Sequence, residues 1–162
     1  MKRRDLDKLG LEPDPLDGRH PFSETELARF EKKFKHKLPP DYVEFLRHHN
    51  GDWPSNAPTF GDAEVEVQSF FYLRPEGEVE IDDPKVGEFC NLWVQHRQYG
   101  KTLGDGVLPI ADTSSGSPVL VVCEKDKSWI GFINLEEAPP KRKSIEHLAD
   151  SFTEFVKLLQ VK

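Results

Sequence analysis

The sequence predicts a single α+β domain with a largely antiparallel central sheet, flanked by N-terminal, middle and C-terminal helices. Apolar residues recur at helical spacing over residues 22–50 and 150–160, whereas the runs 64–81 and 107–135 alternate apolar and polar residues as strands do. A chain of 162 residues has the usual size of one domain. Strands grouped between helices are typical of an α+β fold rather than of alternating βαβ units.

Residues 1–21 are expected to form an N-terminal arm, and residues 22–162 the domain itself. The arm is rich in proline, aspartate and glycine, which favour turns. Leu9, Leu11 and Leu16 are its candidates for contact with the core. The arm lacks the apolar stretch of a secretory signal, so we expect a cytoplasmic protein.

The two cysteines and the longest apolar run also favour a cytoplasmic protein. Cys90 and Cys123 are far apart in the sequence, and a disulfide scaffold would need more of them, so a reducing compartment is expected. The longest purely apolar run, residues 119–123, is too short to span a bilayer. We therefore expect no membrane contact.

Two helices are expected between residues 22 and 50. The first begins after Ser23, because Ser23 and Glu26 have the spacing of a capping box. The second begins at the double proline of "LPPDYVEFLRHHNG" (38–51), since proline is tolerated in the first turn of a helix. It ends at Asn-Gly, because glycine readily adopts the left-handed conformation there. Its expected buried stripe consists of Tyr42, Phe45, Leu46 and His49.

Five strands and two more helices are expected beyond residue 60. Runs 64–73 and 77–81 alternate, and we expect them to pair with each other. A helix is expected over 84–99, with Pro84 at its start and Gly100 at its end. Its expected apolar face is Val86, Phe89, Cys90, Trp93 and Val94. The remaining elements are strands over 107–111, 118–124 and 129–135, with a hairpin between the last two, and a final helix over 150–160.

Acidic residues are concentrated in one segment. Residues 62–88 contain nine acids against Arg74 and Lys85, which accounts for the whole formal net charge of −7. Such a segment argues against nucleic-acid binding, which needs cations facing phosphates. It is either a solvated surface or a face that binds a basic partner.

No catalytic, metal or cofactor motif stands out. "GKT" at 100–102 lacks the glycine that a phosphate-binding loop needs at Gln95. His48 and His49 project about 100° apart on a helix and cannot readily share a metal. His96 and Cys90 have no second pair of ligands to complete a tetrahedral site. We therefore expect no enzymatic activity, no metal and no cofactor.

Four segments resemble the SUKH superfamily of Smi/Knr-type proteins. "LPPDYVEFLRHHNG" (38–51) is similar to its hallmark of Leu-Pro, Tyr, Phe-Leu and closing Asn-Gly. "LPIADTSSGSPVLVV" (108–122) and "WIGFINLE" (129–136) resemble its central strands, and "LADSFTEFV" (148–156) its C-terminal helix. The four segments occur in the family's order.

The resemblance implies an α+β domain without known enzymatic activity. Many bacterial members are immunity proteins that bind and neutralise a cognate toxin, whereas fungal relatives regulate cell-wall synthesis and signalling through protein partners. The family has no catalytic residues to carry over. This sequence departs from the family in an acidic insert near residues 74–83 and in its charged arm, where partner choice would be expected to reside.

We expect a non-enzymatic protein-binding domain, most simply an immunity protein against a basic nuclease-type toxin; a regulatory or scaffold domain is the alternative. An acidic inhibitor would gain association rate and specificity against a basic toxin. Trp53 either anchors an interface or folds back onto the core. Pairing of the strands 64–73 and 77–81 would align their glutamates in one carboxylate row. The expected partner-binding residues are Asp52, Trp53, Glu64, Glu66, Glu78, Glu80, Asp82 and Asp83.

Overall fold

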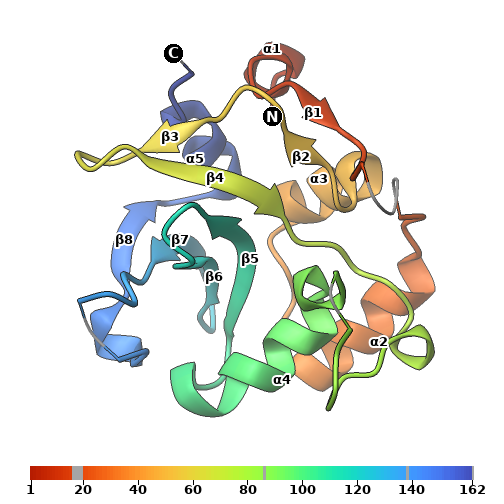
Figure 1. Cartoon of the computed structure of the whole chain (residues 1–162). Helices are drawn as coiled ribbons and strands as arrows, with labels where there is room; N and C mark the ends of the chain where they lie inside the picture. The colour runs from red at the N-terminus through yellow and green to blue at the C-terminus, as the bar shows by residue number, and fades with distance from the viewer. Residues whose placement is uncertain (16–19, 86, 138, 162) are drawn as a thin grey trace.

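The computed structural model describes residues 1–15, 20–85, 87–137 and 139–161. In this part of the chain, six antiparallel strands form a curled sheet in the order β3-β4-β5-β6-β7-β8 (Figure 1). The strands are β3 (Thr59–Phe60), β4 (Val65–Phe70), β5 (Val107–Thr113), β6 (Val119–Cys123), β7 (Ser128–Phe132) and β8 (Glu146–Ala149). A separate ribbon pairs β1 (Leu11–Glu12) with β2 (Trp53–Pro54).

Helices at both ends and in the middle of the chain cover this sheet. The α-helices are α1 (Arg3–Asp7), α2 (Glu24–Phe34), α3 (Pro40–His49), α4 (Leu92–Leu103) and α5 (Phe152–Leu158). Three short 3-10 helices are η1 (Glu76–Glu78), η2 (Glu88–Cys90) and η3 (Arg142–Ser144). The predicted α+β domain with a largely antiparallel sheet is confirmed.

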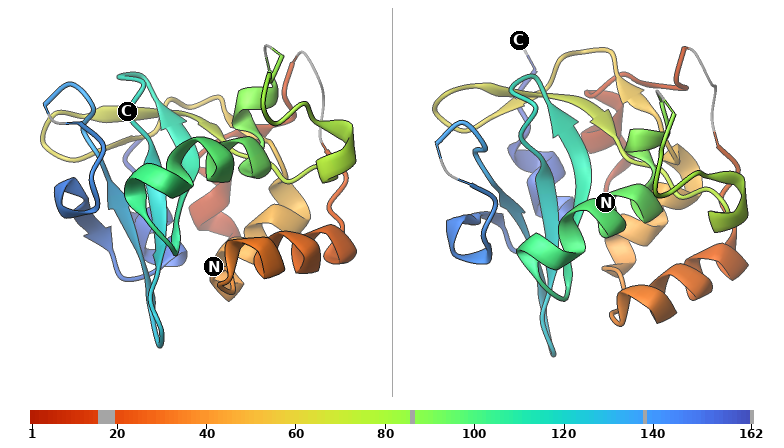
Figure 2. Two further views of the ribbon diagram at one scale, coloured as in Figure 1. Left: turned by 90° about the horizontal axis from the view of Figure 1, so that it is seen from below. Right: turned by 60° about the horizontal axis from the view of Figure 1, so that its bottom comes forward.

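Both faces of the sheet are buried, and β6 shows how. Its alternate residues Val119 and Val121 face a large core shared with α2, α3 and α5, whereas Leu120 and Val122 face a smaller cluster beside the C-terminal half of α4. A strand covered on both faces is expected to be continuously apolar, as "VLVVC" is. The hairpin that joins β6 to β7 projects beyond the rest of the domain (Figure 2).

The Asn-Gly sequence at the end of α3 fastens the helix to the sheet. Asn50 is 1% exposed, and its side-chain oxygen accepts a hydrogen bond from the Leu73 backbone N–H at 2.8 Å. Its side-chain nitrogen donates to the carbonyls of Leu73 (3.0 Å) and His20 (3.2 Å). Gly51 follows in the left-handed region, with φ +89°, where a side chain would be strained. The Asn-Gly motif therefore stabilises the fold.

The N-terminal arm docks on the domain through its first twelve residues. Leu9 is fully buried in the core and Leu11 packs against it, which confirms two of the three predicted contacts. The Lys8 ammonium donates to the carbonyls of Lys157 (3.2 Å) and Leu159 (2.6 Å), and so binds unpaired carbonyls at the end of α5. Leu11 packs against the core from β1, and Leu16 lies outside the described residues.

The predicted strand over 77–81 is wrong. Pro75 precedes the short 3-10 helix η1, and no residue from 77 to 81 is in a strand. Alternation alone cannot supply the partner that a strand needs, and β4 pairs instead with β3 and β5. The carboxylate row expected from pairing of these two segments does not form.

The middle helix begins later and ends later than predicted. Gly87 has φ +97°, which interrupts helical backbone, and Asn91 caps α4 by accepting a hydrogen bond from the Trp93 N–H at 3.0 Å. Val86, which was placed on this helix, lies outside the described residues. Gly100 sits inside α4, and Gly104, with φ +84°, follows its last turn. Phe89 is consequently exposed in η2 rather than buried on a helix face.

Four further strands were not predicted, and the predicted strand β4 is irregular. The strands β1, β2, β3 and β8 have two to four residues and arise from pairing with neighbours rather than from local alternation. In β4, a register shift between Val67 and Ser69 interrupts the alternation, so that Phe70 and the following Phe71 are both buried.

A candidate protein-binding surface

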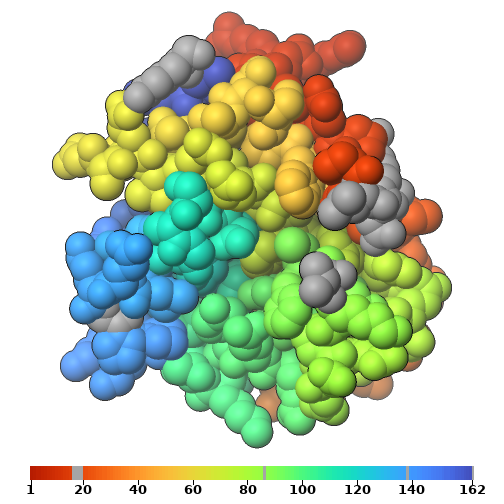
Figure 3. All heavy atoms as spheres, in the orientation of Figure 1, coloured from red at the N-terminus to blue at the C-terminus, as the bar shows by residue number. Residues whose placement is uncertain are grey.

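The fold divides the acidic segment into two groups on opposite sides of the molecule (Figures 1 and 3). The hairpin acids, Asp62, Glu64 and Glu66, belong to the β3–β4 hairpin, which forms the yellow lobe at the left of both views. The loop acids lie between β4 and α4. They are Glu76, Glu78, Glu80, Asp82, Asp83 and Glu88.

Basic residues of the same chain partly neutralise the loop acids. Arg97 of α4 lies 3.0 Å from Asp82, and Arg29 of α2 lies 3.9 Å from Glu76. Within the loop itself, the ion pairs are Arg74–Glu78 at 3.5 Å and Lys85–Glu80 at 3.2 Å. Exposed pairs of this kind contribute little to stability, typically about 0–1 kcal/mol each. They nevertheless reduce the negative potential that a partner would meet on this side.

A buried carboxylate holds the start of this loop in place. Glu26 of α2 is 5% exposed, and its Oε1 accepts hydrogen bonds from the Trp93 indole N–H (2.9 Å) and the Glu76 backbone N–H (2.8 Å). Only half of the predicted capping box is thereby formed, because Ser23 accepts from the Glu26 N–H at 3.2 Å while the Glu26 carboxylate serves the loop. Farther along, the Tyr72 hydroxyl donates to the Gly87 carbonyl at 2.8 Å.

The hairpin acids have a different environment. No lysine or arginine in the described residues lies within ion-pair distance of Asp62 or Glu66; Glu66 instead accepts a hydrogen bond from the Gln68 amide. The turn is tight, with Gly61 at φ +72° and Glu64 at φ +50°. A non-glycine residue at positive φ is uncommon and carries a conformational cost. The hairpin therefore presents its acids on a well-defined turn.

Asp52 and Trp53, next to each other in the sequence, have opposite exposures. Asp52 is fully buried, and its carboxylate lies 2.8 Å from Nδ1 of His49, so its side chain acts inside the fold and does not reach a partner. Trp53 is 37% exposed on β2, opposite Glu12 in β1. Trp53 therefore remains a candidate contact residue, whereas Asp52 supports the loop from within.

Two exposed apolar residues were missed by the sequence analysis. Phe89 in η2 is 48% exposed, and Leu158 at the end of α5 is 49% exposed. The flanking Gly87 and Asn91 are the sequence signal that removes Phe89 from a helix face. For Leu158 the signal is helical spacing, because the buried residues Phe152, Phe155, Val156 and Leu159 form a stripe that leaves Leu158 on another face.

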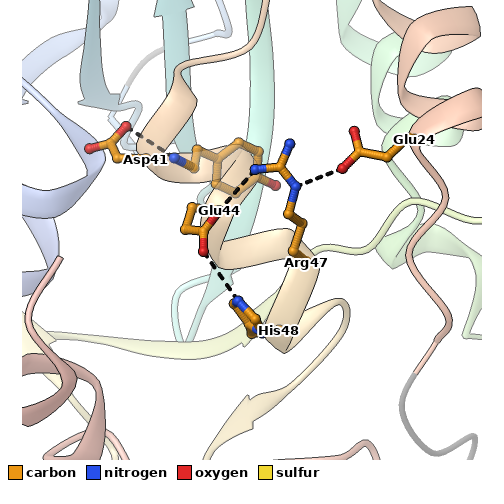
Figure 4. A network of polar contacts seen from close by, with 6 residues as sticks. Glu24, Asp41, Glu44, Arg47 and His48 are labelled. Atoms are coloured by element: carbon orange, nitrogen blue, oxygen red, sulfur yellow. Dashed lines mark hydrogen bonds and ion pairs between the residues drawn. The ribbon is translucent and has the colours of Figure 1, made fainter.

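The exposed face of α3 carries a polar network rather than a reactive site (Figure 4). Arg47 donates to Glu24 at 2.7 Å and to Glu44 at 2.9 Å, and Nε2 of His48 lies 3.2 Å from Glu44. Hydrogen bonds from Arg47 and then His48 lower the pKa of the Glu44 carboxyl, and those to Glu24 and Glu44 raise the pKa of Arg47. These side chains, together with Asp41, join α3 to α2 and α5.

A cleft of about 660 Å³ lies between α2, α4 and the loop acids. Its floor includes Phe34, Trp93 and His96, with Lys33 and Lys101 at its rim. Burial and then Lys33 lower the pKa of His96. Hydroxyl and thiol nucleophiles do not line it, and no group of three or more His, Cys, Asp or Glu side chains suited to a metal occurs in residues 1–15, 20–85, 87–137 and 139–161.

The two thiols are not activated. Burial raises the pKa of Cys123 to about 12, with a smaller contribution from Glu31, and burial also raises the pKa of Cys90. Thiols with raised pKa values are poor nucleophiles. In the part of the chain that the structure describes, no helix has the length and apolar character needed to cross a bilayer.

The architecture is that of a helix-covered, antiparallel α+β domain whose distinctive features lie on its surface loops. The model of the SMI1 / KNR4 family (SUKH-1) matches residues 21–158. The chain therefore belongs to this family, and the resemblance seen in the sequence is confirmed. No curated protein gives a match to the chain. Residues 1–20, which include the docked arm, precede the matched region.

Proposed function

We propose that this protein is a non-enzymatic immunity protein that binds and neutralises a cognate toxin domain, most simply one with a basic, nucleic-acid-binding surface. The family contains proteins of this kind, and its membership here covers residues 21–158. The observation that carries the proposal is the exposure of acids on two loops that the core holds in place. Such a surface steers a basic partner and excludes nucleic acid.

The proposed contact residues follow from exposure. Trp53 supplies a partly exposed aromatic side chain, of the kind that dominates interface energetics. The proposed rim charges are Glu64 and Glu66 on the hairpin side and Glu78, Glu80, Asp82 and Asp83 on the opposite, loop side. Rim charges mainly govern association rate and its salt dependence, whereas a central apolar anchor governs dissociation.

Co-expression with a toxin domain tests the proposal. The chain is produced in cells that express the product of the adjacent gene, and both growth and complex formation are measured. We expect growth to be rescued and the two chains to co-elute in gel filtration. Absence of both rescue and complex would contradict an immunity role. A stable complex with an endogenous protein, without rescue, would favour a regulatory or scaffold domain instead.

A further inference from the structure

We propose that the groove between the β3–β4 hairpin and β8 binds an extended, basic segment of the partner protein. The inference rests on the proposed binding function and gives it a location. It differs from a general acidic face because it assigns direct contact to the hairpin side of the molecule, away from the loop acids. It also adds Leu158 as an apolar contact on the hairpin side, beside the contact proposed for Trp53.

The groove lies where the curled sheet stays open. β3 and β8 are the two edge strands, and in Figure 1 they stand apart at the left, with α5 behind β3 and β4. Phe60 of β3 reaches inward, with ring centroids 5.2 Å from Phe132 of β7 and 5.8 Å from Phe155 of α5. Phe60 and Phe155 also line the opening. Leu148 and Leu158 line the resulting groove of about 310 Å³.

The groove has room and apolar surface for one large side chain. A pocket of roughly 300 Å³ is at the lower end of the range that holds small ligands. Leu158 keeps 49% of its surface exposed here, the largest fraction among the exposed large apolar residues of the described chain. Covering it would remove apolar surface from water at about 25 cal/mol per Å².

The outer edges of β3 and β8 differ in whether a further strand could pair with them. The outer edge of β3 is bridged by the chain itself, because Thr59 and Gln160 exchange backbone hydrogen bonds of 2.8 and 2.9 Å. Beside β8, no strand of the described residues covers the outer edge. β8 has only four residues and a register irregularity, which limits the length of any added strand. The backbone of β8 therefore sets the direction of an extended partner segment, and the groove supplies the affinity.

The charge of both walls selects a basic segment. Residues 61–66 and 146–154 together contain six acids and neither lysine nor arginine. Asp62 lines the groove on the hairpin side. On the β8 side, His147 lines it with Nε2 2.8 Å from Asp150. A lysine or arginine beside an apolar side chain in the groove would meet the Asp62 carboxylate on the hairpin side, and the acids near β8 would add to the attraction.

A peptide experiment tests the groove independently of any toxin. The intact chain is labelled with nitrogen-15 and titrated with a seven-residue peptide of alternating lysine and leucine; the same peptide with glutamate for lysine is the control. We expect amide shifts in residues 59–62 and 146–149 and near Leu158, with the lysine peptide only. Shifts confined to residues 76–83, or equal shifts with both peptides, would overturn the proposal.

Matched variants sharpen the result. Leu158→Ser and Phe89→Ser remove apolar residues of nearly equal exposure, 49% and 48%, from the groove and from the other side of the molecule. Asp62→Lys and Glu80→Lys form the corresponding charge pair. Leu158→Ser and Asp62→Lys are expected to weaken peptide binding at least tenfold, and the Phe89 and Glu80 variants less than twofold. Thermal melts identify any variant that fails to fold.

The toxin assay separates this inference from the proposed function. If the wild type neutralises the toxin and Leu158→Ser does so equally well, the proposal that the partner binds in the groove is contradicted and the immunity role stands. If the wild type neutralises no toxin but the peptide shifts follow the expected pattern, the immunity role falls and the groove is supported.

Discussion

Replacement of Asn50 by alanine should destabilise the fold strongly. Its side chain is 1% exposed and makes hydrogen bonds of 2.8 Å and 3.0 Å with the backbone of Leu73 and 3.2 Å with the carbonyl of His20. The variant leaves the buried Leu73 N–H and at least one carbonyl without a partner. Each unsatisfied buried group costs about 1–3 kcal/mol, so the expected loss is about 3 kcal/mol.

Urea unfolding followed by circular dichroism measures this loss. Asn56→Ala is the matched control, because Asn56 is exposed and its side chain donates a single hydrogen bond, to the Lys8 carbonyl at 2.8 Å. The control should lose less than about 1 kcal/mol, the typical net value of one hydrogen bond. A loss of under about 1 kcal/mol for Asn50→Ala would refute the reasoning, since the buried groups of Leu73 would then be satisfied in another way. Loss of partner binding without loss of stability would make the Asn-Gly motif functional rather than architectural.

Three further predictions concern the arm, a thiol and a histidine. Leu9→Ala should lower the free energy of unfolding by about 2–5 kcal/mol, because Leu9 is fully buried, and an unchanged urea midpoint would show that the arm does not dock. Cys123 is 4% exposed and its pKa is raised to about 12, so it should react with a thiol reagent at neutral pH only after unfolding; rapid reaction of the folded protein would contradict its burial. Burial, followed by Lys33, holds the pKa of His96 below that of the unfolded chain, about 6.5, so the unfolded state binds more protons just below this pH and stability should fall as the pH drops through it. In urea melts from pH 8 to pH 5, His96→Gln should lose part of that pH dependence, and an identical profile for the variant would contradict the assignment.

Elements with strong local signals were predicted well. The Ser23 cap, the buried stripe of Tyr42, Phe45 and Leu46, and the apolar strands over 107–135 are set by residues close in sequence. The failed strand over 77–81 depended on a pairing partner, and β8 becomes a strand only because β7 lies beside it. Strand formation is a property of the pair, which a single segment does not encode.

The candidate surface was predicted less well because its properties depend on residues far apart in sequence. Local net charge located the acids, but two of the bases that pair with the loop acids, Arg29 and Arg97, come from separate helices. Asp52 was expected to contact a partner, yet it is fully buried and its carboxylate lies beside His49. The groove beside Leu158 is lined by residues from the hairpin, β8 and α5, and no pattern within one of these segments predicts it.

The association rate with the toxin domain, measured by stopped flow from low to high salt, tests the central claim most directly. Two double variants each remove two negative charges: Asp62→Asn with Glu66→Gln on the hairpin, and Glu78→Gln with Glu80→Gln in the loop. We predict slower association with a flatter salt dependence for the hairpin pair, and a smaller effect for the loop pair, whose acids already face Arg74 and Lys85. Unchanged rates for both variants at every salt concentration would contradict the claim that the acidic surface binds a basic partner.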